Sequence, residues 1–133
     1  MGEPMSNIEI IRELYRAFEA EGLDRIMELC DPNCVVTHDS ALPWGGRYEG
    51  LDGVATFGIA LGGAIDSVVT ANAMFEAGDR VIQCGRSRGT VLATGAEFDM
   101  PEVHVWTLRD GKVTAAEFYI DTHAMLDVLS HAS

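Results

Sequence analysis

The chain has 133 residues, of which 47% are hydrophobic and 23% charged, and its formal charge is −12 at pH 7. This length suits a single domain over residues 1–133, and the mixture is that of a soluble globular protein. Nucleic acids and anionic membranes are polyanions, so the negative charge argues against both as partners.

The sequence also indicates in which cellular compartment the protein is expected. It has no apolar run of the roughly 20 residues that cross a bilayer, and its start, MGEPMSNIEI, lacks the basic and apolar regions of a secretory signal. The first five residues are expected to be disordered or foreign to the natural chain. Cys30, Cys34 and Cys84 cannot all pair with one another, which favours free thiols in a reducing compartment. We therefore expect a cytoplasmic protein without a metal site.

Two helices are predicted at the start. Ser6 and Glu9 have the spacing of a capping box, and apolar residues then recur every three or four positions up to Gly22, a typical residue after a helix end. The segment 23–30 predicts a second helix that stops before Pro32.

A strand and a third helix follow. Residues 34–39 are rich in β-branched side chains and predict a strand, and residues 51–63 predict a helix. Between them, the segment 42–46 holds Trp44 and two glycines, and such a loop could close over a pocket.

The second half predicts a meander of strands. Asp110-Gly111 is a strong hairpin signal, and residues 122–133 look helical. Four strand-like runs cover residues 66–78, 79–93, 96–110 and 111–121. Helices followed by strands predict an α+β fold, in which a curved antiparallel sheet forms a cone and the N-terminal helices pack on its concave face.

Three segments carry a family resemblance: LYRAFEAEGLDRIMELCDPNCVVTHD, RYEGLDGVATF and VHVWTLRDGKVTAAEFYID. In this order of elements, the chain resembles the nuclear transport factor 2-like superfamily with its cystatin-like cone, and especially the SnoaL-like branch. Ketosteroid isomerases and limonene epoxide hydrolases are among the relatives of that branch. The resemblance implies a homodimer formed through the outer sheet face and an enzyme without a cofactor. The fold hosts many activities, so the function has to be argued from the site.

The isomerase-like relatives imply one set of site residues. Their catalytic Asp closes the first strand, where this chain has Asp39, with His38 beside it. Their oxyanion donors, a Tyr and a protonated Asp, correspond to positions near Leu14 and Val103, and Tyr15 is one residue from the first. Asp39 could instead cap a turn.

The hydrolase-like relatives imply another set. Their catalytic Asp ends the last strand behind an aromatic residue, a pattern that Asp121 and Tyr119 match. Arg86 or Arg88 could supply their arginine, although the Asp that should follow it is missing. Asp121 could equally cap the final helix, and the two arginines could form surface or interface ion pairs.

Alternation along strands predicts which side chains see a pocket. His38 and Asp39 should point to opposite faces, so only one of them should see it. If Val103 and Val105 face the cavity, His104 faces outward, towards a second subunit. Further residues expected around a small apolar ligand are Trp44, Tyr48, Tyr15, Phe57, Met100 and Tyr119.

The sequence therefore predicts a small-molecule enzyme that uses pocket carboxylates, Asp121 and Asp39, for proton transfer on an apolar or polycyclic substrate. An isomerase, a cyclase, a hydrolase and a dehydratase all fit this description. The alternative is a non-catalytic module of the same fold that binds a small ligand or dimerises.

Overall fold

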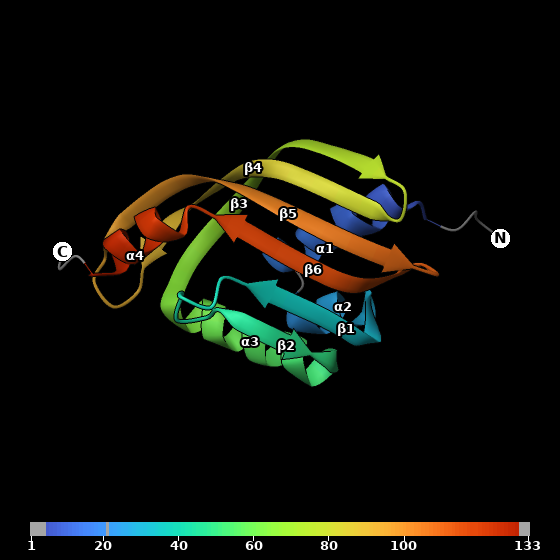
Figure 1. The fold of residues 1–133 in the computed structure, drawn as a ribbon, viewed down its shortest axis with the longest axis horizontal. Coiled ribbons are helices and arrows are strands. Elements are labelled where there is room, and N and C mark those ends of the chain that lie inside the picture. The colour runs from blue at the N-terminus through green and yellow to red at the C-terminus, as the bar shows by residue number, and fades with distance from the viewer. Residues whose placement is uncertain (1–4, 21, 131–133) are drawn as a thin grey trace.

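The computed structural model describes residues 5–20 and 22–130, and it shows a mixed α+β fold in which helices cover one face of a curved six-stranded sheet (Figure 1). Residues 1–4 of the expected N-terminal tail, and residues 131–133 of the expected last helix, lie outside the described residues. The predicted fold class is confirmed.

The first helices form where the local signals predict them. Helix α1 spans Asn7–Ala20 and begins with the capping box, in which the Ser6 amide donates to Glu9 Oε1 (3.1 Å) and the Glu9 amide donates to Ser6 Oγ (3.3 Å). The chain then turns at Gly22, whose φ of 80° suits a residue without a Cβ. Helix α2 follows at Leu23–Glu28.

The sheet has the strand order β2-β1-β6-β5-β4-β3. The β5–β6 hairpin turns at Asp110 and Gly111, whose φ values of 51° and 77° fit the predicted turn. Neighbouring strands are antiparallel except β1 and β6, which run parallel. The remaining elements are β1 Cys30–His38, β2 Gly46–Glu49, α3 Gly50–Ala64, β3 Ile65–Ala77, β4 Arg80–Val91, β5 Glu97–Arg109, β6 Lys112–Ile120 and α4 Thr122–Ser130.

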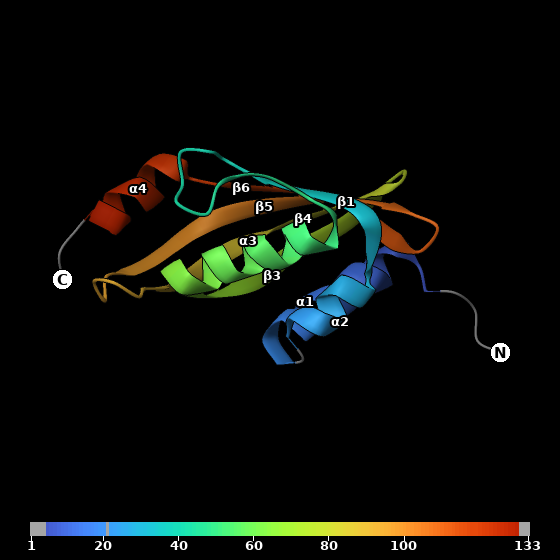
Figure 2. The same cartoon turned by 90° about the horizontal axis from the view of Figure 1, so that it is seen from below.

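The sheet curves over α1, α2 and α3, while α4 lies beyond the end of β6 (Figure 2). Helix α1 places Ile11 and Leu14 in the core, and α3 adds Phe57, which is 8% exposed. None of α1, α2 and α3 lies on the other side of the sheet (Figure 2). The helices and the sheet therefore enclose a core on the concave face.

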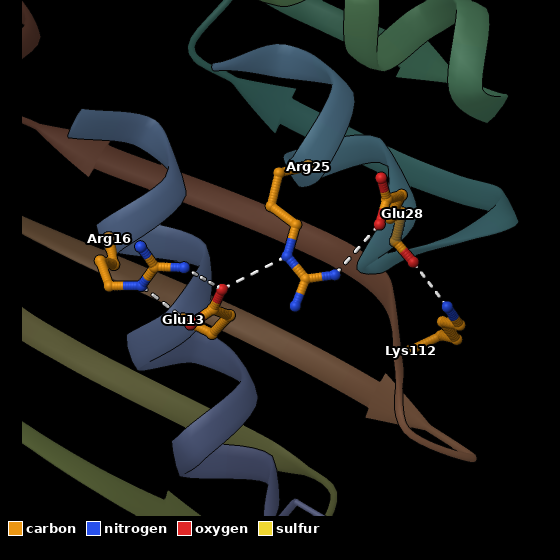
Figure 3. Close-up of polar contacts among 5 residues, drawn as sticks. All are labelled: Glu13, Arg16, Arg25, Glu28 and Lys112. Atoms are coloured by element: carbon orange, nitrogen blue, oxygen red, sulfur yellow. Dashed lines mark hydrogen bonds and ion pairs between the residues drawn. The ribbon is translucent and has the colours of Figure 1, made fainter. Parts of the chain in front are cut away.

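A row of polar contacts ties α1, α2 and the start of β6 together (Figure 3). Glu13 of α1 accepts from Arg25 of α2 at 3.3 Å, and Arg25 also donates to Glu28 at 3.1 Å. Lys112 of β6 donates to the Glu28 carbonyl. These contacts join the two helices and the start of β6 and so orient them relative to one another.

The predicted facing of β5 is wrong. Glu102 and Trp106 are buried on the concave side, and His104 lies between them on the same side, whereas Val103 and Val105 face outward. The expectation assumed that the β-branched residues would take the inner face. The inner polar side chains can be buried because they bind one another.

None of the helices that the structure describes is long and apolar enough to cross a membrane.

Candidate active site

A cavity of about 160 Å³ lies between the concave face of the sheet and helices α1, α2 and α3, and Met125 of α4 also lines it. It opens beside Phe18, which lines it and is 45% exposed. An apolar cavity of roughly 150 Å³ can hold benzene, so this one can hold an aromatic ring. Apolar groups dominate the wall, among them Leu14, Val54, Phe57, Leu61, Ile65, Trp106, Phe118 and Met125.

Five polar side chains other than thiols and indoles reach this wall: Tyr15, His38, Ser67, Ser87 and His104. They come from α1, β1, β3, β4 and β5, so they meet only in the folded chain. A few polar groups in an apolar wall are typical of a small-molecule site, because they fix the orientation of a ligand.

His38 ends β1, and its ring lies among aromatic side chains. The centroids of Trp44, Phe57 and Phe118 are 6.1, 6.4 and 5.9 Å from its own. Burial lowers the pKa of His38 to about 4, against a smaller opposing effect of Asp39. His38 is therefore neutral at physiological pH.

The partners of His38 define which nitrogen holds the proton. Trp44 Nε1–H donates to His38 Nδ1 at 3.0 Å, so Nδ1 is an acceptor. The proton of the neutral ring then belongs to Nε2. Nε2 is buried, and no described residue accepts a hydrogen bond from it. His38, which lines an apolar cavity, thus keeps an unused donor.

Tyr15 is a second polar group in the same wall, and its hydroxyl makes all of its hydrogen bonds to other residues of the protein. Tyr15 Oη lies 3.0 Å from both Trp106 Nε1 and Gln83 Nε2, which can only donate to it. Its own hydrogen goes to His104 Nδ1 at 2.6 Å. The oxygen thereby uses its one hydrogen and both lone pairs.

His104 connects this series of hydrogen bonds to the buried carboxyl group of Glu102. Its Nδ1 accepts from Tyr15, so its Nε2 is protonated and donates to Glu102 Oε2 at 3.1 Å. Burial lowers the pKa of His104 to about 3, and the effect of His38 adds to this. Burial likewise raises the pKa of Glu102 to about 7, against the hydrogen bond from Gln83.

Among the described residues, three buried side-chain atoms lack a hydrogen-bond partner: His38 Nε2, Gln83 Oε1 and Glu102 Oε1. Only the first belongs to a residue that lines the cavity. Tyr15 and His104 are fully occupied by their protein partners. Of the three unpartnered atoms, His38 Nε2 is therefore the one that belongs to the cavity lining.

The two predicted catalytic carboxylates do not face the cavity. Asp39 is exposed and accepts from the Ala41 amide (2.9 Å) and from Thr122 Oγ1 (3.0 Å), which lower its pKa. Asp121 is also exposed, and it accepts from the Ala124 amide at 3.0 Å at the start of α4. Both follow strand ends, where free amides compete successfully for a carboxylate. The expectation that they look inward is wrong.

Some of the other predicted site residues line the cavity, and others lie on the outer face of the sheet. Of His38 and Asp39, His38 is the one that sees the cavity, and Trp44, Tyr15 and Phe57 line it too. Arg86 and Arg88 are exposed on the outer face, as is Tyr119, which is 53% exposed. These three do not reach the cavity, because strand alternation places them on the other side of the sheet.

Two more predicted residues support the wall without forming it. Met100 is 5% exposed, so it is buried, but it does not line the cavity. Tyr48 packs edge-on against Phe57, with ring centroids 5.4 Å apart. Met100 and Tyr48 therefore support the cavity wall through packing.

Sequence reasoning missed Gln83, Glu102 and Trp106. Each occupies an inward position of β4 or β5. The signal in the sequence was the alternation along β5, because the apolar residues Phe98 and Met100 mark the face that Glu102, His104 and Trp106 continue. Within residues 5–20 and 22–130, no three His, Cys, Asp or Glu side chains lie together in a way that could hold a metal ion.

Comparisons with known proteins place this geometry in context. The model of the SnoaL-like domain matches residues 11–116. A search of curated proteins gives no significant match. An NTF2-like protein of unknown function from Burkholderia pseudomallei K96243 superposes with a TM-score of 0.88 at 26% identity, over 96% of this chain and 100% of the other.

Two further structures are similar. TerC, crystallised with polyporic acid, has a TM-score of 0.86 at 28% identity, over 94% of this chain and 98% of its own. A protein from Jannaschia sp. CCS1, named as a candidate SnoaL-like polyketide cyclase, has a TM-score of 0.78 at 22% identity, over 99% and 100%. The second likeness concerns the fold alone.

Proposed function

The chain belongs to the SnoaL-like domain family, and from that premise we propose that it is a cofactor-independent enzyme acting on a small apolar molecule that bears a carbonyl group. The reaction is a proton transfer of the isomerase, cyclase, hydrolase or dehydratase type. The observation that supports this most directly is the unused, buried Nε2–H of His38, a residue that lines the apolar cavity.

The proposed role of His38 is to polarise the substrate oxygen. When a carbon next to a carbonyl gives up a proton to a water molecule, which acts as the base, negative charge develops on the carbonyl oxygen. A fixed donor in a water-poor site stabilises that charge, and removing one such donor typically lowers kcat by about 10² to 10³. A neutral imidazole can serve in this way, because its N–H is a donor at every pH above its pKa. Asp39 and Asp121 have no part in this step.

The relatives support binding of a small molecule. TerC was crystallised with polyporic acid, and that protein is 28% identical to this chain over 94% of its length. The cavity described above lies where helices and sheet enclose an apolar core, and its volume of about 160 Å³ leaves room for a ring.

A non-catalytic ligand-binding module is the second candidate. One observation favours it: the cavity lining contains no Asp or Glu among the residues that the structure describes. The buried carboxyl group of Glu102 does not line the cavity and contacts the lining residue His104 from behind. Such a module would bind the ligand through His38 and leave it unchanged.

We also propose that two copies associate through the outer sheet face and that the protein works in the cytoplasm. Val68 and Phe75 are about half exposed on that face, with fractions of 50% and 49%. Cys30, Cys34 and Cys84 are all free thiols, which suits a reducing compartment.

Two probes of nearly equal shape test the role of His38. Acetophenone offers a carbonyl oxygen, and α-methylstyrene replaces that oxygen by a CH₂ group. We expect the wild type to bind acetophenone about three- to tenfold more tightly, which is the worth of one hydrogen bond. His38→Phe should abolish the difference, and Asp121→Asn should preserve it. Equal affinities in the wild type would refute the proposal.

Exchange of the acetophenone methyl protons in D₂O, followed by NMR, separates the two candidates. An enzyme should accelerate this exchange, and His38→Phe should slow it by about 10² to 10³. Binding of acetophenone without faster exchange would favour the non-catalytic module.

A further inference from the structure

Trp44, whose indole N–H donates to His38, is completely buried, with 0% exposure. Its indole N–H can only donate, so the 3.0 Å contact to His38 Nδ1 requires that Nδ1 be unprotonated. A ring that changed tautomer would set two N–H groups against each other and lose this hydrogen bond.

Building on the proposed function, we propose that Trp44 is a positioning residue that holds His38 in the Nε2–H form and thereby makes the cavity selective for ligands with a hydrogen-bond acceptor. The favoured class is apolar molecules with a carbonyl or similar oxygen. Ligands whose only polar group is a donor are disfavoured, because they would meet the N–H of His38 with an N–H of their own.

The loop between β1 and β2 gives Trp44 little freedom. The Leu42 amide donates to the Asp39 carbonyl (3.1 Å), and the Gly45 amide donates to the Leu42 carbonyl (2.9 Å). Tyr48 Oη–H is placed to donate to the Trp44 carbonyl at 3.0 Å or to the Gly45 carbonyl at 3.3 Å. Hydrogen bonds thus hold the backbone on both sides of Trp44.

Asp39 fixes the same loop to the last helix. One of its oxygens accepts from the Ala41 amide and the other from Thr122 Oγ1 of α4. A Cβ at Gly45 would lie 1.8 Å from the Asp39 carbonyl oxygen, so the chain can pass at this distance only with glycine. The predicted lid is therefore a pinned loop with its aromatic residue in the core.

The cavity wall holds a matched control. Trp106 also lines the cavity and also donates its indole N–H, but to Tyr15 and not to His38. Trp44→Phe and Trp106→Phe remove the same group from the same cavity. Only the first should change the tautomer of His38.

The decisive measurement is the ¹⁵N NMR spectrum of the His38 ring. In the wild type, we expect the proton on Nε2 alone. Trp44→Phe should give a mixture of tautomers, whereas Trp106→Phe should keep the wild-type signature. A proton on Nδ1 in the wild type would overturn the inference even if neither variant folds, and so would an unchanged spectrum in Trp44→Phe.

Binding tests the selectivity. Acetophenone presents an acceptor, and indole presents only a donor. We expect the ratio of their affinities to fall about three- to tenfold in Trp44→Phe relative to Trp106→Phe. An unchanged ratio would overturn the selectivity. If the wild type instead fails to distinguish acetophenone from α-methylstyrene, the proposed function fails, while the ¹⁵N signature still decides the role of Trp44.

Discussion

Glu102 shows how strongly burial acts on a single side chain in this fold. It is 2% exposed, and only one of its oxygens has partners, namely His104 Nε2 and Gln83 Nε2. The other oxygen and Gln83 Oε1 both lie within 3 Å of the point where a Cβ at Gly85 would stand, at 2.9 and 2.6 Å. Two unpaired acceptors are therefore turned to the same place, which favours a proton on the carboxyl group.

This arrangement predicts how Glu102→Gln changes stability with pH. The pKa of Glu102 is raised from 4.5 to about 7, so the folded state binds the extra proton. Its contribution to stability is full below about pH 4.5 and is lost as the pH rises through 7. The glutamine keeps one acceptor and can donate to Gln83 Oε1. We expect the variant to be more stable than the wild type by about 1 to 3 kcal/mol at pH 8.

Urea unfolding of both proteins at several pH values checks this prediction. His38 and His104, whose pKa values are lowered to about 4 and 3, give the opposite slope below pH 6.5 in both proteins. The difference between the proteins therefore isolates Glu102. A difference that does not grow between pH 5 and 8 would contradict a raised pKa.

At the scale of elements, local signals predicted the chain well. The capping box of Ser6 and Glu9 and the Asp110-Gly111 turn specify their own geometry within a few residues. Strand β2 was missed because its four residues, Gly46–Glu49, contain no apolar alternation and pair only with β1. The face of β5 was misread because it depends on partners in β4 and α1 that lie far away in sequence.

The same reasoning explains the error over the site. Asp39 and Asp121 stand where the family resemblance implied, but their surroundings could not be inferred from position. Whether a carboxylate at a strand end turns to a cavity or to nearby amides depends on the path of the next loop. Here the loop after β1 turns back at once, and α4 begins directly after Asp121.

The loop that holds Trp44 predicts a contrast between two glycines. Gly45→Ala would place a Cβ 1.8 Å from the Asp39 carbonyl oxygen, and Gly62→Ala, in α3, would meet no described atom within 4 Å. We expect the first to lower the unfolding free energy by about 1 to 3 kcal/mol, as overpacking does. The second should raise it by about 0.5 to 1 kcal/mol through helix propensity.

Thermal unfolding followed by circular dichroism measures both variants under the same conditions. If Gly45→Ala is as stable as the wild type, the loop can move away from Asp39, and the pinning of Trp44 would be weaker than its contacts indicate.

At the scale of the whole molecule, the two sides of the sheet differ in what covers them. Its concave side holds the cavity beneath α1, α2 and α3, and none of these three helices lies on its outer side (Figure 2). Phe75 pairs with Ile82 on that outer side, and Tyr119 pairs with Val103. Apolar side chains on an otherwise acidic protein suit contact with a second copy.

Charge predicts how this proposed dimer responds to salt. Each copy has a formal charge of −12, so association brings like charges together. Screening at higher ionic strength reduces the repulsion, because the Debye length falls from about 10 Å at 0.1 M to about 3 Å at 1 M salt. We therefore expect the dimer to become tighter as salt increases, in contrast to an interface held by ion pairs.

Sedimentation equilibrium on matched variants tests the face as well as the state. Phe75→Glu puts a charge on the outer side of the sheet, where burial against a second copy would be costly, and it should yield monomers. Ile59→Glu changes an even more exposed apolar residue, at 72% against 49%, but on α3 and away from that side. It should leave the dimer intact. Because Ile59 differs from Phe75 mainly in its face, dissociation of both variants, or of neither, would count against the outer sheet as the interface.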